Sequence, residues 1–124
     1  MSPRSDEYME MARHGLAQAR HNLEGGFNDG AATTAYYVMF HAAQAALSEA
    51  GAYAKTHSGV WTLFSETYVK PGLVPSDLAG VATGAQQRRQ EVEYELLHAT
   101  REEAEGLIAA AARFVQIIED HFAG

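Results

Sequence analysis

The sequence contains no cysteine, only three prolines among its 124 residues, and no long apolar run. Without cysteine, a disulfide framework, a thiolate zinc site and a thiol nucleophile are all excluded. No stretch of roughly 18 apolar residues is present that would cross a membrane. The polar start of the chain, residues 1–10, has no apolar core of the kind a secretory signal needs. We therefore expect a cytoplasmic protein that does not bind membranes.

The motifs of several common enzyme classes are missing as well. Glycine-rich phosphate loops, dinucleotide-binding glycine patterns and nucleophile elbows do not occur. The formal net charge is −7, and this charge repels polyphosphate backbones at long range. Non-specific binding to nucleic acid is therefore disfavoured, unless a local basic patch overrules the average.

What the sequence does have is alanine and helical periodicity. Five segments place apolar residues on one helical face, and no segment of useful length alternates with period two. These segments are residues 6–24, 31–50, 58–69, 77–97 and 100–122. Short connections between amphipathic helices favour antiparallel neighbours. The sequence therefore predicts an all-α fold, an up-and-down bundle of four long helices and one short helix, in a single domain over residues 1–124.

Residues that cap helices precede three of these segments. Thr56 or Ser58 is predicted to cap the third, and Ser76 or Asp77 the fourth. The last segment opens at Thr100 with the spacing of a capping box.

Arg89 is the residue that fits this bundle least well. On the fourth segment, at about 100° per residue from Ala85, Arg89 lies at about 40° and Glu93 at the edge of the stripe. The apolar residues of the same stripe are Leu78, Val81, Ala82, Val92 and Leu96. Because a guanidinium keeps its charge, it needs polar partners there. Either Arg89 snorkels to solvent or pairs with Glu93, or the stripe opens into a polar pocket or a dimer cleft. Tyr94 is predicted to point away, toward a second surface.

Two further polar features are candidates for binding. One is a stripe on the second segment that carries a phenol, an imidazole and an amide where a solvated face usually carries Lys and Glu. It consists of Tyr37, His41, Gln44 and Ser48. The other is the turn Lys55-Thr56-His57-Ser58, where helix amides beside a Lys and a His can hold an anion. An uncharged surface and a simple capping turn are the alternatives.

A metal centre is not expected, and neither is any other cofactor. Glu95-Leu96-Leu97-His98 has the Glu-x-x-His spacing of di-iron bundles. Such a site needs a second motif of this kind, and the sequence has none.

Three strings, taken in order, resemble the HEPN domain family, small helical bundles named from higher eukaryotic and prokaryotic nucleotide-binding proteins. They are Ala35-Tyr36-Tyr37-Val38-Met39-Phe40-His41-Ala42-Ala43, Lys55-Thr56-His57-Ser58-Gly59-Val60 and Arg89-Gln90-Glu91-Val92-Glu93-Tyr94. The last looks like the Arg-x-x-Ala-Asp-Tyr signature of one bacterial and archaeal branch. The resemblance implies a homodimer, and many members are encoded beside a minimal nucleotidyltransferase as a toxin–antitoxin pair.

Active members of the family are metal-independent ribonucleases with an Arg-x(4–6)-His motif, in which the His acts as a general acid or base. The Arg stabilises phosphate charge. In this sequence the positions after Arg89 where that His should lie are Tyr94, Glu95 and Leu96. Arg89 therefore matches the arginine of the motif, but no histidine follows it at the expected positions. His41 or His57 could take that place if the fold brings one of them near Arg89.

Three hypotheses follow from the sequence. The first is a non-catalytic dimeric binding module for nucleotide, RNA or a partner protein, in a toxin–antitoxin-like or nucleotidyltransferase-linked system. The second is a ribonuclease toxin whose catalytic candidates are Arg89, His41 and His57. The third is a structural dimer with a buried Arg89–Glu93 pair and no ligand. The candidate ligand-binding residues are Tyr37, His41, Lys55, His57, Ser58, Arg89, Glu93 and Tyr94.

Overall fold

A computed structural model describes residues 1–123, and in this range the chain forms helices and no strand. The elements are α1 (Pro3–Glu24), α2 (Asn28–Glu49), α3 (His57–Phe64), the π-helical turn η1 (Ser65–Val69), α4 (Leu78–Tyr94) and α5 (Arg101–Phe122). The predicted all-α class is confirmed. None of the described helices is both long enough and apolar enough to cross a membrane.

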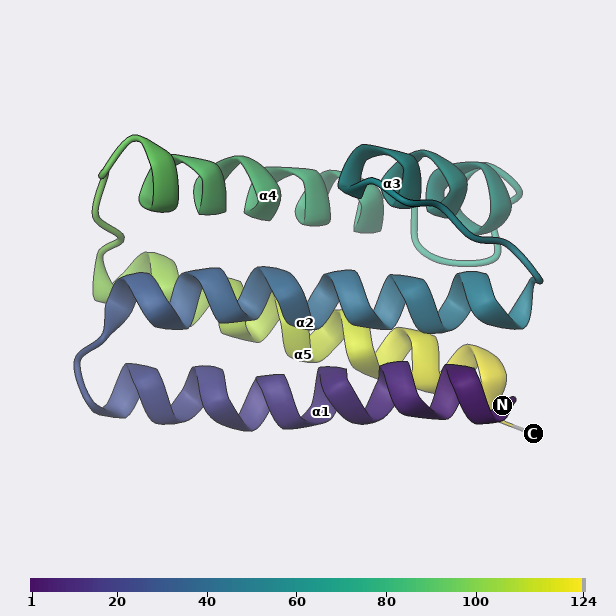
Figure 1. Cartoon of the computed structure of the whole chain (residues 1–124), viewed down its shortest axis with the longest axis horizontal. Helices are drawn as coiled ribbons and strands as arrows, with labels where there is room; N and C mark the ends of the chain where they lie inside the picture. The colour runs from purple at the N-terminus through teal and green to yellow at the C-terminus, as the bar shows by residue number, and fades with distance from the viewer. Residues whose placement is uncertain (124) are drawn as a thin grey trace.

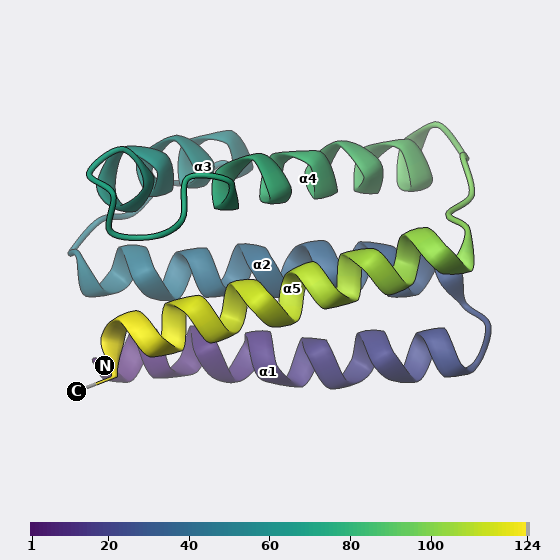
Figure 2. The same ribbon diagram turned by 180° about the vertical axis from the view of Figure 1, so that it is seen from behind.

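Helix α2 is the centre of the bundle. It runs antiparallel to α1, and α3 and α4 follow one another along its other side (Figure 1). Seen from behind, α5 crosses over α1 and α2 (Figure 2). Because α2 contacts all four other α-helices, its small alanine side chains are buried on several sides. Both α3 and α4 therefore pack on side chains of α2.

The close packing of α1 on α2 depends on small residues. A Cβ atom added at Gly15 would lie 3.0 Å from Cγ2 of Val38, so a larger residue there would require the Val38 side chain to shift. The turn that reverses the chain contains Gly26 with φ of +82°, a left-handed conformation that glycine adopts without strain. The two glycines thus permit a short, tight helical hairpin.

Two of the three predicted helix caps are present. Thr56, rather than Ser58, accepts the N–H of Gly59 at 3.0 Å. Thr100 and Glu103 form the predicted capping box. The prediction for α4 is wrong, because Asp77 makes no capping hydrogen bond. Its carboxylate instead accepts from Arg113 on α5, at 3.0 Å and 3.2 Å.

Helix α4 ends earlier than its periodicity predicts. The last helical residue is Tyr94, and Leu96 adopts a left-handed φ of 58° with 76 % of its surface exposed. The predictions that the helix continues to Leu97 and that Leu96 faces inward are therefore wrong. Tertiary hydrogen bonds hold the chain just beyond this point, since Asp29 accepts from the N–H of Ala99 at 2.7 Å. Those bonds compete with a further helical turn.

Asp29 makes this connection sensitive to acid. Its hydrogen bond with His98, the Ala99 N–H and the nearby positive charges hold its pKa below the usual 3.8. A carboxyl whose pKa is depressed in the folded state stabilises the fold fully above its unfolded pKa. This stabilisation is lost as the pH falls through the folded pKa.

We predict that Asp29→Asn lowers the free energy of unfolding at pH 7 by on the order of 1 kcal/mol, because Asp29 is partly exposed and screened. The variant and the parent should converge as the pH falls below 3.8. Urea unfolding at a series of pH values between 7 and about 2 measures this. Asp6→Asn, on the exposed first turn of α1, is the control. A gap between parent and Asp29→Asn that stays constant with pH would contradict the prediction.

Candidate functional site

Arg89 lies on the face of α4 that packs against α2, and only 7 % of its surface is exposed. Its guanidinium carbon lies 5.3 Å from the ring centre of Tyr36, 5.5 Å from that of Tyr37 and 5.9 Å from that of Tyr94. A cation is attracted to an aromatic face, and more strongly where water is excluded. The three rings therefore replace part of the hydration that the buried charge has lost.

The guanidinium also has two polar partners. Nη1 of Arg89 donates to Oε2 of Glu93 at 2.8 Å and to the hydroxyl of Tyr37 at 3.3 Å. The side chain of Glu93 is 32 % exposed, against 8 % for that of Arg89, so the carboxylate lies between the cation and solvent. The predicted pairing of Arg89 with Glu93, one helical turn apart, is thus present. In addition, Arg89 donates to the phenol of Tyr37 on α2.

One donor of Arg89 has no acceptor. Its Nε atom is buried and makes no hydrogen bond to any residue in the range 1–123. An unpaired buried donor costs about 1–3 kcal/mol. Such a cost is tolerated mainly where a residue serves something other than stability.

The Tyr36 ring under this cation belongs to a chain of hydrogen bonds that ends at His57, at the start of α3. Nε1 of Trp61 donates to the hydroxyl of Tyr36 at 3.1 Å, and that hydroxyl lies 2.7 Å from Nδ1 of His57. An indole N–H only donates, so the Tyr36 oxygen accepts from it and its own proton goes to His57. The opposite arrangement would leave the hydroxyl proton of a fully buried tyrosine without an acceptor. His57 therefore accepts at Nδ1 and carries its proton on Nε2.

The surroundings of His57 keep its ring neutral. The imidazole stacks on Phe40, with ring centres 4.2 Å apart and planes 10° from parallel. Burial, followed by the positive charge of Arg89, lowers the pKa of His57 below its ordinary 6.5. At pH 7 the side chain is thus a hydrogen-bond donor at Nε2 and carries no charge.

His41 has the opposite tautomer. Its Nδ1 lies 2.9 Å from the amide oxygen of Gln44, which only accepts, so the His41 proton is on Nδ1. Its Nε2 therefore has a free lone pair. The ring of Tyr37 lies between the two histidines, 6.3 Å from His41 and 5.9 Å from His57. A donor and an acceptor imidazole thus flank one tyrosine.

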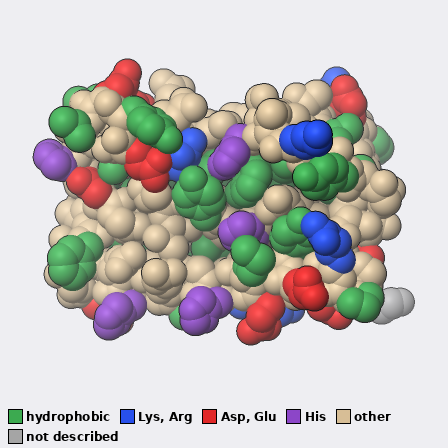
Figure 3. Space-filling view, in the orientation of Figure 1, with side chains coloured by type: hydrophobic (Ala, Val, Ile, Leu, Met, Phe, Trp, Pro, Cys, Tyr) green, Lys and Arg blue, Asp and Glu red, His purple; other side chains and the backbone are tan. Residues whose placement is uncertain are grey.

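We define the Arg89 site as this set of neighbouring side chains, contributed by α2, α3 and α4. Its members are Tyr36, Tyr37, His41, His57, Arg89, Glu93 and Tyr94. Figure 3 shows histidine and hydrophobic side chains gathered in the middle of the face on which α2 lies between α1 and the pair α3 and α4. The site is therefore a mixed aromatic and polar surface with one buried cation.

Two candidate residues from the sequence lie outside this set. Ser58 is exposed and lies 3.4 Å from the hydroxyl of Thr56. It lines a different hollow, between α3 and α4. Lys55 is exposed and makes no hydrogen bond or ion pair with the described residues. Of the predicted anion-binding turn, only His57 joins the Arg89 site.

The position of Tyr94 corrects a prediction. The helical angle predicts a ring that serves a surface away from Arg89, yet the ring lies 5.9 Å from that guanidinium while 72 % exposed. Helical angle alone places the Cα, and a long aromatic side chain can reach back along its own helix. Tyr94 is thus the solvent-facing ring of the site.

The periodicity of the sequence does not single out Tyr36 and Trp61 as site residues. Both are buried, so their apolar spacing identifies them as core. A signal is available nonetheless, because a buried hydroxyl and a buried indole N–H each need a partner. That they partner each other and His57 is visible only in three dimensions.

Within residues 1–123 no three His, Asp or Glu side chains converge as metal ligands would. His98, from the Glu-x-x-His string, donates instead to Asp29 at 2.7 Å.

We predict that the two histidines show opposite tautomers in long-range ¹H–¹⁵N NMR spectra above pH 7, with the proton on Nε2 in His57 and on Nδ1 in His41. His57 should titrate below 6.5. Arg89→Met should raise the pKa of His57, because removing a neighbouring positive charge favours the imidazolium. Arg13→Met, which removes an exposed cation of α1, is the matched control. An unchanged His57 pKa in Arg89→Met would contradict this geometry.

The whole chain has relatives of known classification. A family model for the HEPN domain matches residues 5–121. A UPF0332 protein of Gloeobacter violaceus is 30 % identical over 125 aligned residues, covering 99 % of this chain and 99 % of the relative. A Methanocaldococcus jannaschii protein named "Putative toxin MJ0605" is 31 % identical over 111 residues, covering 90 % of this chain and 83 % of the relative.

Two solved structures have the same fold. TT1696 from Thermus thermophilus superposes with a TM-score of 0.82 at 24 % identity, covering 98 % of this chain and all of that one (100 %). ST0689, an archaeal HEPN homologue, superposes with a TM-score of 0.76 at 20 % identity, covering 96 % and 98 % of the two chains. The family model and the relatives together support one conclusion: the chain belongs to the HEPN domain family.

Proposed function

We propose that this protein is a toxin-like HEPN module that binds RNA at the Arg89 site and lacks an efficient catalytic histidine. The observation that carries the proposal is the buried guanidinium of Arg89, which lies among three tyrosine rings and pairs with one partly exposed carboxylate. Family membership supports a toxin-like role, as does the similarity to the Methanocaldococcus protein.

The chemistry of the site suits a single-stranded RNA segment. A phosphodiester can accept from the Arg89 guanidinium, the Nε2–H of His57 and the hydroxyl of Tyr37. Bases of unpaired RNA stack on exposed aromatic rings, and Tyr94 offers one that is 72 % exposed. The carboxylate of Glu93 competes with the phosphate for the same cation. Binding therefore requires that Glu93 move aside.

The overall charge limits how such RNA is held. The net charge of −7 repels further phosphates, and the Arg89 site holds a single cation, so about one or two phosphates are neutralised there. Stacking and hydrogen bonds must then supply most of the affinity, and the dependence on salt should be shallow.

We further infer that the protein acts as a homodimer and has a minimal nucleotidyltransferase as its partner, as the family resemblance implies. The end of α4 supports a protein contact, because Tyr94, Leu96 and Leu97 are exposed beside the Arg89 site. Sedimentation equilibrium of the purified protein tests the dimer. Co-purification with the product of a neighbouring gene tests the partner. A monomer that retains no such protein would refute this part of the proposal.

We predict that Arg89→Met weakens the binding of single-stranded RNA about tenfold or more, because a hydrogen bond to a charged group contributes about 1.5–3 kcal/mol. Glu93→Gln should strengthen binding several-fold, since it removes the competing carboxylate. Fluorescence anisotropy with a labelled RNA at several salt concentrations measures both effects. The expected slope of log K against log salt is about −1, from a slope of about −0.7 per phosphate.

Arg113→Met is the matched control, since Arg113 is an exposed arginine of α5 that pairs with Asp77 and contacts no member of the Arg89 site. It should bind RNA as the parent does. If the parent binds no RNA, and Arg89→Met is as stable to heat as the parent, the Arg89–Glu93 pair is purely structural. Apolar replacements of buried pairs are often tolerated in that way.

A ribonuclease is the second candidate, and the opposite tautomers of His41 and His57 favour it. In such a reaction Nε2 of His41 would take the proton of a 2′-hydroxyl, whose oxygen bonds to phosphorus while the P–O5′ bond breaks. The leaving 5′-oxygen needs a proton, which His57 can give only as imidazolium. Because burial and Arg89 disfavour that charge, cleavage by this route is slow at neutral pH.

We predict for this second candidate that any RNA cleavage by the purified protein has a bell-shaped dependence on pH: it rises as the pH falls from about 7.5 and His57 gains its proton, and it falls where the base His41 is protonated as well. His57→Ala and Arg89→Ala should each abolish it, together with any growth arrest on expression. His21→Ala changes an exposed histidine in the last turn of α1 and should leave both unchanged. An absence of cleavage and of growth arrest in the parent would eliminate the ribonuclease and leave the binding module.

A further inference from the structure

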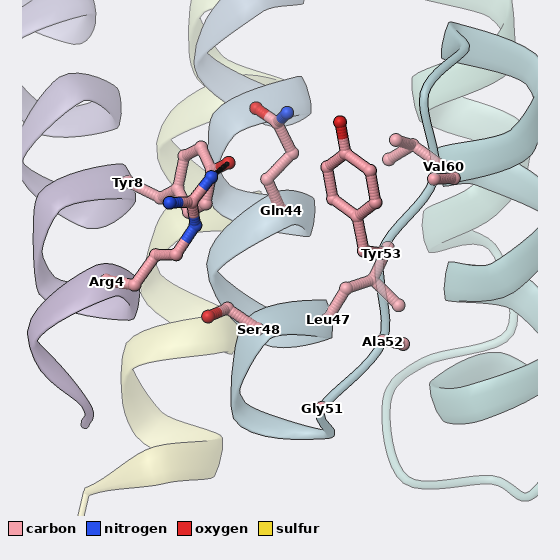
Figure 4. A pocket seen from close by; sticks show the side chains of 10 residues that line it. Arg4, Tyr8, Gln44, Leu47, Ser48, Gly51, Ala52, Tyr53 and Val60 are labelled. Carbon is pink, nitrogen blue, oxygen red and sulfur yellow. Dashed lines mark hydrogen bonds between the residues drawn. The ribbon is translucent and has the colours of Figure 1, made fainter.

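A groove outside the Arg89 site crosses α2 near its C-terminal end. It lies between the first turns of α1, the last turns of α2 and the segment 51–54 that leads to α3, and its volume is about 360 Å³. Pockets that bind small molecules are typically about 300–1,000 Å³. We call it the Tyr53 groove. Figure 4 shows Tyr8 and Arg4 on one side, Tyr53 on the other, and Gln44 and Ser48 between them.

The aromatic wall of the groove is unusually exposed. Tyr53 has 68 % of its surface in solvent, and its ring stacks on no other ring in the described part of the chain. A tyrosine on a loop normally buries more of its apolar ring. Beneath it, Leu47 and Val60 supply an apolar floor. The groove therefore presents a flat ring and an apolar base to a flat ligand.

The cationic rim of the groove lacks a counter-charge. The guanidinium of Arg4 lies 5.4 Å from the ring centre of Tyr8 and donates to its hydroxyl at 3.2 Å. No carboxylate of residues 1–123 lies within ion-pair distance of it, although acidic residues outnumber basic ones by 16 to 9. Lys55, two residues beyond Tyr53, likewise forms no ion pair in that range. One unpaired cation, Arg4, thus lines an aromatic groove in an acidic protein.

Gln44 gives the groove a defined polar edge. Its amide oxygen is held by Nδ1 of His41 at 2.9 Å, so the amide NH₂ remains free as a donor. Ser48, one turn further along α2, adds a hydroxyl on the same side. A ligand that stacks on Tyr53 would therefore meet hydrogen-bond donors along its edge.

We propose that the Tyr53 groove binds a nucleobase that carries a phosphate. The base would stack on Tyr53 with its acceptor edge on Gln44 and Ser48, and the phosphate would pair with Arg4. An aliphatic anion would leave the Tyr53 ring unused, and an apolar peptide would leave the amide and the cation unused. No residue of the groove belongs to the Arg89 site.

The two sites are connected through one helix face. Tyr37, His41, Gln44 and Ser48 follow one another at helical spacing along α2, and His41 touches Gln44 directly. The nucleotide can be free or part of an RNA strand that continues from Arg89 along this stripe. For RNA as the source, the inference rests on the proposed function. If the ligand is a free mononucleotide, its binding to the groove does not depend on the proposed RNA binding at the Arg89 site.

The experiment uses AMP, UMP, adenosine and a short oligoadenylate as probes in ¹H–¹⁵N NMR titrations of the full chain. AMP should shift the backbone amides of residues 44–54, and Tyr53→Ala should weaken its binding about tenfold, as loss of one stacked base predicts. Arg4→Gln should weaken AMP binding and leave adenosine unchanged. Phe27→Ala and Arg20→Gln remove an equally exposed aromatic ring and an exposed cation elsewhere, and should change neither.

The outcomes separate the groove from the RNA proposal. If AMP binds the groove and oligoadenylate binds nowhere, the groove is a mononucleotide site and RNA binding at Arg89 is refuted. If oligoadenylate binds in an Arg89-dependent manner, Tyr53→Ala binds it equally well and AMP does not shift residues 44–54, the groove proposal fails while the proposed function stands. If no probe shifts residues 44–54, the groove proposal fails outright. Because Tyr53 is on the surface, its replacement should leave the melting temperature unchanged.

Discussion

The guanidinium of Arg89 lies between α4 and the tyrosines of α2, and the organisation of the site depends on that burial. A charge that cannot be neutralised has to be surrounded by rings, a phenol and a carboxylate before α4 can pack. These partners in turn determine what the neighbouring side chains can do. The Tyr36 ring under the cation is also the ring whose hydroxyl contacts His57. The charge of Arg89 is thereby coupled, through Tyr36, to the hydrogen bond at His57.

That coupling makes the two histidines unequal. Tyr36 donates to His57, and His41 donates to Gln44, so one imidazole offers an N–H and the other a lone pair. In the active ribonucleases of this family a histidine follows the arginine within a few residues on the same helix, whereas this chain has Tyr94 and Glu95 there. Histidines from α2 and α3 occupy the neighbourhood instead. They are present, yet burial and Arg89 hold one of them neutral by lowering its pKa, which agrees better with recognition than with fast catalysis.

The acidic character of the chain gives its few unpaired cations particular weight. Most arginines are neutralised by a nearby carboxylate, as Arg88 is by Glu103 at 2.7 Å and Arg113 by Asp77 at 3.0 Å. Arg4 is not, and it lines the Tyr53 groove. Arg20, Lys55 and Lys70 likewise form no ion pair within residues 1–123, but they do not line the groove. A ligand with a phosphate would find its counter-charge there and at Arg89, at the two ends of one stripe of α2. The distribution of charge, more than its sum, is thus what makes nucleotide chemistry reasonable for this surface.

The helical class, the five segments, the capping box at Thr100 and the anomaly of Arg89 were all predictable from the sequence, because they depend on local spacing and side-chain type. The sequence also carried the three strings that resemble the HEPN family. The end of α4, the return of Tyr94 to Arg89, the Trp61–Tyr36–His57 chain and the Tyr53 groove were decided by tertiary structure. Each depends on residues from different helices, and periodicity says which face a residue occupies but not which partner it meets. For the same reason, the sequence proposed Lys55 and Ser58 together with His57, and only the packing of α3 on α2 separated them.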